Sequence, residues 1–215
     1  MRSFGSSCFA ALLASLHLVA GTALAQPPAK LTVTAPVDRS STAPVDVYRL
    51  DVTVNLSEGT LDGRMALRYR NVSSMPLSSV RLRLDPNLNA GVSIEIVAVD
   101  DADGHPLPRT LRPLTFGKLS SEAGALDVAL ARPLPPGAET TVKIQFRSSG
   151  RHITADLLVL QDDPYHSFDA WYPKAMTPRD AGWSIDDDRL ADYDVTLRYP
   201  ASYTVASASP PAPAN

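Results

Sequence analysis

Cysteine is almost absent from this sequence. The one cysteine among 215 residues, Cys8, lies in an apolar stretch near the N-terminus that we expect to be removed as a leader. The mature chain would then have no thiol, which excludes disulfide bonds, cysteine nucleophiles and thiolate metal sites. Without disulfides, the domain must be stabilised by its own hydrophobic core, which a chain of this length can bury.

Common catalytic motifs are missing as well. None of the four histidines (His17, His105, His152 and His166) begins an H-E-x-x-H zinc motif. No serine lies in G-x-S-x-G, and no glycine-rich phosphate loop is present. We therefore predict no catalytic residue, no metal ligand and no cofactor on this chain.

The sequence also lacks an excess of positive charge and any long apolar run. Lys plus Arg is 20 and Asp plus Glu is 23, a net charge of −3, which argues against a nucleic-acid partner. The longest apolar stretch is shorter than the roughly 20 residues of a spanning helix, so we expect no membrane span after leader cleavage. The 19 prolines disfavour long helices, because proline removes a donor and clashes with the preceding turn.

Residues 1–25 are predicted to be a secretory signal peptide. Arg2 supplies the positive start, residues 8–20 the apolar core, and Ala23-Leu24-Ala25 a small-x-small cleavage site. The protein is therefore expected to be exported, to a periplasmic or extracellular location, and the composition is typical of bacteria. A retained membrane anchor is the alternative, which the short apolar core disfavours.

After the leader, a short-strand pattern dominates. Residues 26–44 are rich in Pro, Ser and Thr and are predicted to be a flexible arm. Apolar and polar residues alternate over 48–56 and 61–70, with a turn between them, which predicts a hairpin. Further strands are expected near 82–84, 92–99, 126–130, 142–146, 157–160, 193–199 and 203–206. The parity change at Ile96 and Val97 indicates either a bulge or a fully buried strand. The pattern predicts an all-β, antiparallel β-sandwich over 45–208, followed by a Pro/Ala tail at 209–215.

Two sets of charged residues each allow two interpretations. Five arginines on predicted polar strand faces favour cross-strand pairs with Asp51, Asp62 and Asp85, and an anion site is the alternative; they are Arg64, Arg68, Arg70, Arg81 and Arg83. The aspartates at 186–188, with Asp192 and Asp194, favour a solvated turn and strand face over a calcium site.

The segment 162–183 concentrates both tryptophans of the chain, Trp171 and Trp183, together with His166 and Asp169. Aromatic side chains on loops often mark binding sites, so the two tryptophans are candidates for a peptide or glycan site. The favoured interpretation, however, is that both rings cover one edge of the sandwich core.

Several ordered segments together resemble the N-terminal β-sandwich domain of the aminopeptidase N family of zinc metallopeptidases (gluzincins). They are YRLDVTVNL at 48–56, LDGRMALRYRN at 61–71, LRLDPN at 82–87, PLPPG at 133–137, VKIQF at 142–146, WYP at 171–173, GW at 182–183 and ADYDVTLRYP at 191–200. The similarity covers roughly 45–208. It implies a non-catalytic sandwich that shapes the substrate side of a catalytic domain.

In that family the zinc site and the glycine-x-methionine-glutamate-asparagine loop lie in a following thermolysin-like domain, which has no counterpart here. The resemblance therefore implies a truncated product or a piece of a longer enzyme, with a zinc-peptidase domain as partner in cis or in trans. Zinc is expected only in a full-length member. His166 and Asp169 are the substrate-side candidates that it implies. The alternative function is a stand-alone secreted module that binds peptide or glycan through Trp171 and Trp183.

Overall fold

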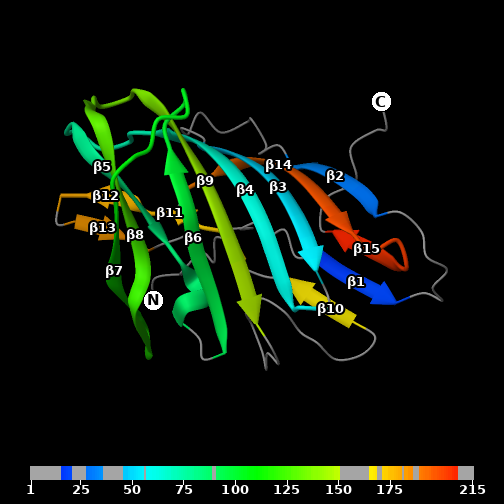
Figure 1. The fold of residues 1–215 in the computed structure, drawn as a ribbon. Coiled ribbons are helices and arrows are strands. Elements are labelled where there is room, and N and C mark those ends of the chain that lie inside the picture. Colours follow the sequence, from blue (N-terminus) through cyan, green and yellow to red (C-terminus); the bar gives the residue numbers. More distant parts are fainter. Residues whose placement is uncertain are drawn as a thin grey trace, which may run out of the picture.

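A computed structural model of the chain describes residues 16–20, 28–35, 46–55, 57–88, 91–150, 165–168, 171–180, 182–185 and 189–207. The described part is built of strands, with one short 3-10 helix, η1 (Asp85–Leu88) (Figure 1). The strands are β1 (Leu16–Ala20), β2 (Ala29–Ala35), β3 (Asp46–Asn55), β4 (Thr60–Arg70), β5 (Leu77–Arg83), β6 (Val92–Asp100), β7 (Arg109–Phe116), β8 (Leu119–Leu134), β9 (Glu139–Gly150), β10 (Tyr165–Phe168), β11 (Lys174–Ala175), β12 (Thr177–Arg179), β13 (Gly182–Ser184), β14 (Ala191–Tyr199) and β15 (Tyr203–Ser207). This confirms the predicted all-β class.

The largest sheet has six strands in the order β2-β14-β3-β4-β9-β6. The predicted hairpin is confirmed: β3 and β4 pair antiparallel, and buried and exposed residues alternate along both. One pair departs from the antiparallel expectation, because β14 runs parallel to β3. A parallel pair needs a long connection rather than a hairpin, and here most of the chain separates the two strands.

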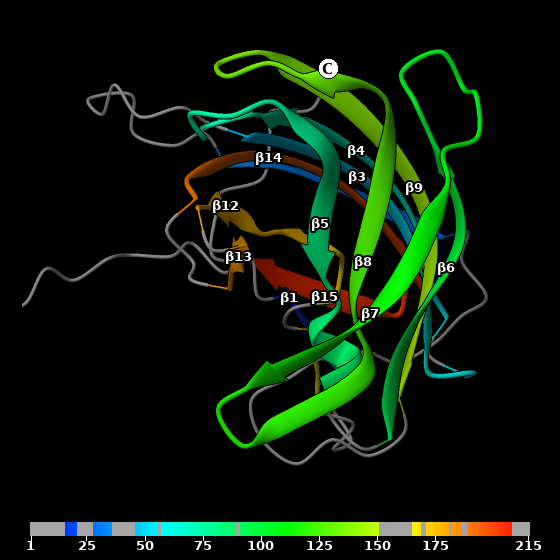
Figure 2. The ribbon, with the colours of Figure 1, turned by 90° about the vertical axis from the view of Figure 1, so that its left-hand side faces the viewer.

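A second sheet, in the order β11-β5-β8-β7, packs against the first and closes the sandwich. Figure 2 shows β5, β8 and β7 lying across the six-stranded sheet. The core between the layers is apolar and fully buried, and includes Val52, Leu67 and Ile144 from one sheet and Val80, Leu82, Leu126 and Val128 from the other. Two-layer packing explains why strand residues on one face are apolar and those on the other are polar.

The predicted bulge in β6 is confirmed. The register with β9 shifts between Ile96 and Ala98, which leaves the Val97 side chain 53% exposed. The Arg109 guanidinium donates hydrogen bonds to the carbonyl oxygens of Ile96 and Val97, at 3.3 and 3.1 Å. Because β6 is an edge strand, the bulge and the arginine together obstruct pairing with another chain.

Seven strands lie in segments for which the sequence predicted none: β1, β2, β7 and the short strands β10 to β13. β2 falls within the predicted arm at 26–44 and pairs with β14 over its whole length, because Leu31 and Val33 alternate with Lys30, Thr32 and Thr34. β1 falls within the predicted leader and pairs with β10 and β15. Leader cleavage and the domain boundaries stay predictions. The expected strand at 157–160 and the tail at 209–215 lie outside the described residues.

A glycine in the middle of β4 lets an aromatic ring cross the core. Gly63 pairs with Phe146, and a Cβ at Gly63 would lie 2.2 Å from Cζ of that ring. We expect Gly63→Ala to lower the free energy of unfolding by about 1–3 kcal/mol, because the added methyl forces the ring from its place. Urea denaturation measures this. The cost should shrink in a Phe146→Leu background, and an equal cost in both backgrounds would contradict the clash.

Candidate functional site

The four candidate residues from the sequence do not form one site in the described part of the chain. His166 lies in β10, opposite Leu18 of β1, in a strand whose side chains the structure does not describe. Asp169 lies outside the described residues. Substrate-side roles for these two residues stay predictions.

Trp171 lies in the core, with 2% of its surface exposed. Its ring centroid is 5.0 Å from that of Tyr172 and 6.4 Å from that of Phe146. Its carbonyl oxygen accepts a hydrogen bond of 2.8 Å from the buried Ser148 hydroxyl. This placement agrees with the interpretation that the ring covers the core, and it leaves no ring face for a ligand to stack on.

Trp183 lies in β13 and is half-buried against the core. The Arg81 guanidinium lies 5.9 Å from the centre of its ring, within the range of a cation–π contact. Arg81 in turn is held by the Asp127 carboxylate through a hydrogen bond of 2.8 Å. Part of the Trp183 surface therefore remains open to solvent, beside a fixed positive charge.

A cluster of tyrosines surrounds the Trp171 segment. The Tyr48 and Tyr193 rings stack at 5.0 Å, and Tyr172 meets Tyr48 edge-on at 5.6 Å. The Tyr48 hydroxyl accepts a hydrogen bond of 2.8 Å from the backbone N–H of Ala175. Burial raises the pKa of Tyr48 and of Tyr172 well above the usual value. Both phenols are therefore neutral at physiological pH, so their contribution is to position the segment rather than to accept protons.

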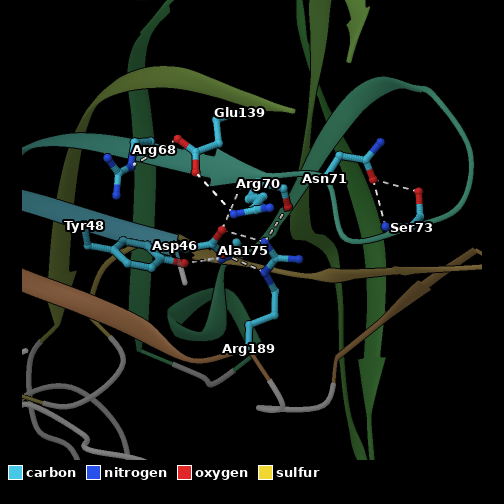
Figure 3. A network of polar contacts seen from close by, with 9 residues as sticks. All are labelled: Asp46, Tyr48, Arg68, Arg70, Asn71, Ser73, Glu139, Ala175 and Arg189. Carbon is cyan, nitrogen blue, oxygen red and sulfur yellow. Dashed lines mark hydrogen bonds and ion pairs between the residues drawn. The ribbon is translucent and has the colours of Figure 1, made fainter. Parts of the chain in front are cut away.

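A buried ion pair ties three distant segments together (Figure 3). The Arg189 guanidinium donates two hydrogen bonds of 2.6 Å to the two oxygens of Asp46, at the start of β3. It donates a third, of 2.9 Å, to the carbonyl of Arg70 at the end of β4, and lies 4.4 Å from the centre of the Tyr69 ring. The Asp46 and Arg189 side chains are 1% and 10% exposed, respectively.

Several groups complete the ion pair's surroundings. The backbone N–H of Arg70 donates to Asp46 at 3.1 Å, so this carboxylate accepts from both segments. The Tyr69 hydroxyl and Nη1 of Arg189 are buried, with no hydrogen-bond partner in the described part of the chain. Burial opposes the charge on Arg189, but the hydrogen bonds and charge of Asp46 outweigh it and raise the pKa of the guanidinium. The guanidinium therefore remains charged, and its hydrogen bonds fix the segment that precedes β14.

The predicted arginine pairs form only in part: Arg83 has the predicted partner Asp85, whereas Arg68, Arg70 and Arg81 have other partners. Arg83 and Asp85 pair at 3.2 Å, and Lys174 lies 3.9 Å from the same carboxylate. Arg68 and Arg70 lie instead 3.7 and 4.0 Å from Glu139. Asp62 pairs with Arg147, and Asp51 with Arg198, rather than with the arginines of the set.

Asp127 is the partner that sequence reasoning missed for Arg81. Arg112, from β7, also donates to this carboxylate, at 3.1 Å. Burial opposes ionisation of Asp127, but the hydrogen bonds and charges of Arg81 and Arg112 outweigh it and lower the pKa of the carboxyl. Because Asp127 faces β5 on one side and β7 on the other, it links three strands on the polar face of the smaller sheet.

Arg64 lies in a depression of about 480 Å³ on the polar face of the six-stranded sheet. The depression is lined by Asp51, Thr53, Asp62, Gly63, Arg64, Val97, Gln145, Phe146 and Arg198. Both lining carboxylates are already paired with other arginines. The anion site stays a hypothesis, with Arg64 as the residue that would carry it.

The potential cation sites differ from the one considered from the sequence. The aspartates at 186–188 lie outside the described residues, and Asp192 and Asp194 lie half-buried on β14. Within the described ranges, Asp101, Asp103 and His105 bring three ligand atoms within 4.8 Å of one another in the turn after β6. Backbone N–H groups already occupy Asp101 Oδ1: the hydrogen bond from His105 is the largest cause that lowers the pKa of this carboxyl. These hydrogen bonds belong to a turn, and the turn alone accounts for the closeness of the three side chains.

One surface feature was not expected from the sequence. Residues 114–121 form a two-stranded arm, the β7–β8 arm, in which Phe116 pairs with Leu119 and Leu114 with Ser121. Its tip is Gly117-Lys118, and the φ of Gly117, +59°, suits glycine. β5 pairs with β8 only from Ala125 onwards, so the arm extends past β5 (Figure 2). Leu111, Phe116 and Leu119 are 50%, 52% and 37% exposed, respectively.

No helix in the described ranges is both long and apolar enough to cross a membrane. Comparison with family models gives no match to this sequence, and comparison with curated proteins gives none either.

Solved structures do show a similar fold. A variant of a two-domain M1 zinc metallopeptidase bound to L-arginine has a TM-score of 0.50 and 18% identity, over 79% of this chain and 40% of that one. The M1 zinc metallopeptidase of Deinococcus radiodurans has a TM-score of 0.49 and 17% identity, over 79% of this chain and 39% of that one. A D. radiodurans variant bound to a Tyr-Ser-Ala substrate has a TM-score of 0.49 and 19% identity, over 73% and 32%. The chain thus has an M1 metallopeptidase-like β fold and spans at most 40% of these structures.

Proposed function

We propose that this chain is the non-catalytic sandwich domain of an exported zinc aminopeptidase-like protein. It would form and stiffen the substrate side of a catalytic domain that these residues do not include. The observation that carries the proposal is the fold: 79% of this chain matches a two-domain M1 zinc metallopeptidase, but only 40% of that structure is matched. The remainder of such a protein would provide the catalytic machinery.

The described residues suit a supporting role. The Asp46–Arg189 pair, the tyrosine cluster and Trp171 fix the segments that precede β11 and β14 with buried contacts. Segments fixed by buried contacts keep their shape when another domain packs against them. Positioning of a substrate requires such rigidity.

The residues that the structure describes do not fit a catalytic zinc. The described metal-ligand candidate, Asp101 with Asp103 and His105, lies in an exposed turn with its main acceptor already occupied. The sequence also has no H-E-x-x-H motif, whose two histidines and glutamate bind zinc and act as the base in zinc peptidases. Zinc would therefore be held by the partner domain, so no catalytic step is assigned to this chain.

The first test is to sequence the genomic reading frame beyond Asn215, together with the neighbouring genes. We expect an H-E-x-x-H segment in frame, after a single frameshift, or in an adjacent gene. Joining or mixing the two products should then give zinc-dependent hydrolysis of an aminoacyl p-nitroanilide, while the purified chain alone should retain no stoichiometric zinc and show no hydrolysis. Unrelated sequence at all three positions would refute the peptidase assignment.

A stand-alone module that binds peptide or glycan through Trp171 and Trp183 is the alternative. It has less support, because Trp171 is buried and only Trp183 retains an accessible surface. NMR or fluorescence titration with peptides and oligosaccharides would favour this alternative if the signals of Trp183 shifted saturably and Trp183→Ala abolished binding.

A further inference from the structure

Basic side chains surround Ala66 on the outer face of the six-stranded sheet. Ala66 lies in the middle of β4, opposite Arg49 of β3 on one side and Lys143 of β9 on the other. Arg64 and Arg68 lie two residues before and after it, so strand alternation places them on the same face. Arg49, Arg64, Arg68 and Lys143 are all exposed, and we call them the basic cluster. Because β3, β4 and β9 are adjacent strands, the cluster gathers its charges around one small residue (Figure 1).

The basic cluster borders a depression of about 230 Å³ in the surface of the sheet. Arg64, Lys143 and Gln145 line it, together with Ala66 and Asp100. The alanine methyl is too short to fill the space between its longer neighbours. The guanidinium, the ammonium and the side-chain amide are hydrogen-bond donors, and Asp100 is the one carboxylate among the described residues that line the depression. The lining therefore consists mainly of donors, which suits an anion.

Two members of the cluster have free side chains. In the part of the chain that the structure describes, the side chains of Arg49 and Arg64 make neither an ion pair nor a hydrogen bond. Each has an aspartate directly opposite in the register. Asp51, opposite Arg64, binds Arg198 instead, and Asp194, opposite Arg49, forms no ion pair with it within the described ranges. Both guanidinium groups therefore retain their donors for a ligand.

The charges of the other two members are only weakly compensated. The Lys143 ammonium donates a hydrogen bond of 2.6 Å to the carbonyl of Ala102, which holds the side chain but does not neutralise it. Asp100, opposite Lys143, makes no ion pair with it among the described residues. Nε of Arg68 lies 3.7 Å from the Glu139 carboxylate, which is too long for a hydrogen bond. The cluster thus carries more positive charge than its surroundings compensate.

This concentration of charge is not explained by stability or by composition. Like charges on neighbouring positions of a sheet repel one another and destabilise it, and the whole chain has a net charge of −3. One arginine is enough to bind a carboxylate through two parallel hydrogen bonds. Several cations around a small depression are better matched to a phosphate group, which has more acceptor oxygens and more negative charge.

We propose that the depression beside Ala66 binds the phosphate group of an anionic ligand. Arg64 and Lys143 would contact the phosphate oxygens, and Arg49 and Arg68 would strengthen the attraction from either side. Because the depression lies on an exposed sheet face, the phosphate can belong to a small soluble molecule or to a lipid headgroup. The proposal is independent of the peptidase assignment.

Calorimetric titration of the chain with inorganic pyrophosphate at low ionic strength tests the proposal. We expect saturable binding of one pyrophosphate per chain. Arg64→Gln/Lys143→Gln should weaken it about tenfold or more, because hydrogen bonds between charged groups are lost. The matched control is Lys118→Gln/Arg132→Gln, which removes one lysine and one arginine from exposed positions at or near β8 in the other sheet and should leave the affinity nearly unchanged.

Ala66→Leu distinguishes a site from general attraction between charges. This variant keeps every cation but fills the depression, so it should weaken pyrophosphate binding about as much as the double variant does. Circular dichroism should confirm the same fold in all variants. No saturable binding by the wild-type chain, an equal loss in the control, or full affinity in Ala66→Leu would each overturn the proposal.

Two further probes identify the source of the phosphate. Sedimentation with phosphatidylglycerol vesicles, compared with phosphatidylcholine vesicles, tests a lipid headgroup. Binding to the anionic vesicles that pyrophosphate displaces and Ala66→Leu abolishes would assign the site to lipid, and binding of pyrophosphate without the vesicles would assign it to a soluble phosphate. Poly-glutamate that binds more tightly than pyrophosphate would overturn the phosphate assignment in favour of an acidic protein partner.

Discussion

Asp46→Ala is expected to lower the free energy of unfolding by about 3–5 kcal/mol, the usual cost of removing one partner from a buried ion pair. Arg189 would be left as an almost fully buried cation whose two shortest hydrogen bonds are lost. The segment before β14 would then lose its tie to β3 and β4. Urea denaturation followed by circular dichroism measures the loss.

Two comparisons make this prediction specific. Arg198→Met, which breaks the exposed Arg198–Asp51 pair on the same sheet, should cost less than about 1 kcal/mol, because water screens such pairs. The double variant Asp46→Leu/Arg189→Met should be less destabilised than Asp46→Ala, because it removes the buried guanidinium together with its carboxylate partner. Equal losses for the buried and exposed pairs would show that the Asp46 contact is not desolvated as described.

Trp171→Ala is expected to cost about 3–5 kcal/mol, as large-to-small replacements of buried aromatic residues do. The indole is 2% exposed and packs against Tyr172 and Phe146, so its removal leaves a cavity between the two sheets. Trp183→Ala should cost only about 1–2 kcal/mol, because that ring is partly in solvent. Urea denaturation of the two variants provides the comparison.

Fluorescence separates a core role of Trp171 from a ligand-binding role. Trp183→Phe leaves Trp171 as the only tryptophan, and its emission should be blue-shifted and resistant to acrylamide quenching. Adding peptide or glycan should not change it. Ready quenching by acrylamide, together with a small loss of unfolding free energy in Trp171→Ala, would show that the ring is exposed. That result would favour the binding-module alternative.

Local pattern was enough to predict most strands. Alternation along β3, β4, β9 and β14 has period 2 and reflects a sheet with one buried face, a property that each segment carries by itself. The bulge at Val97 was also visible, because it interrupts that period. Besides β1 and the short strands β10 to β13, β2 and β7 were overlooked. Pro and Ser residues masked the alternation around β2, and β7 lies at an edge where most of its side chains are exposed.

Partnerships between distant residues could not be predicted from pattern. Asp46 and Arg189 are 143 residues apart, and Arg81 and Asp127 are 46 apart. Their pairing depends on which strands become neighbours and in what register, which polar residues on a strand face do not specify. The tryptophans show the same limit, because composition identified an unusual segment but could not tell a buried ring from an exposed one.

The parallel pairing of β14 with β3 has a consequence for when the chain can fold. β3 is made early in synthesis, but the strand that completes its free side comes from residues 191–199. The centre of the larger sheet therefore closes only after nearly all of the described chain is available. High contact order of this kind slows folding, because distant segments must lose chain entropy before the contacts between them can compensate for that loss. Until β14 arrives, one side of β3 is an unpaired strand edge, which exposes the partly made chain to aggregation.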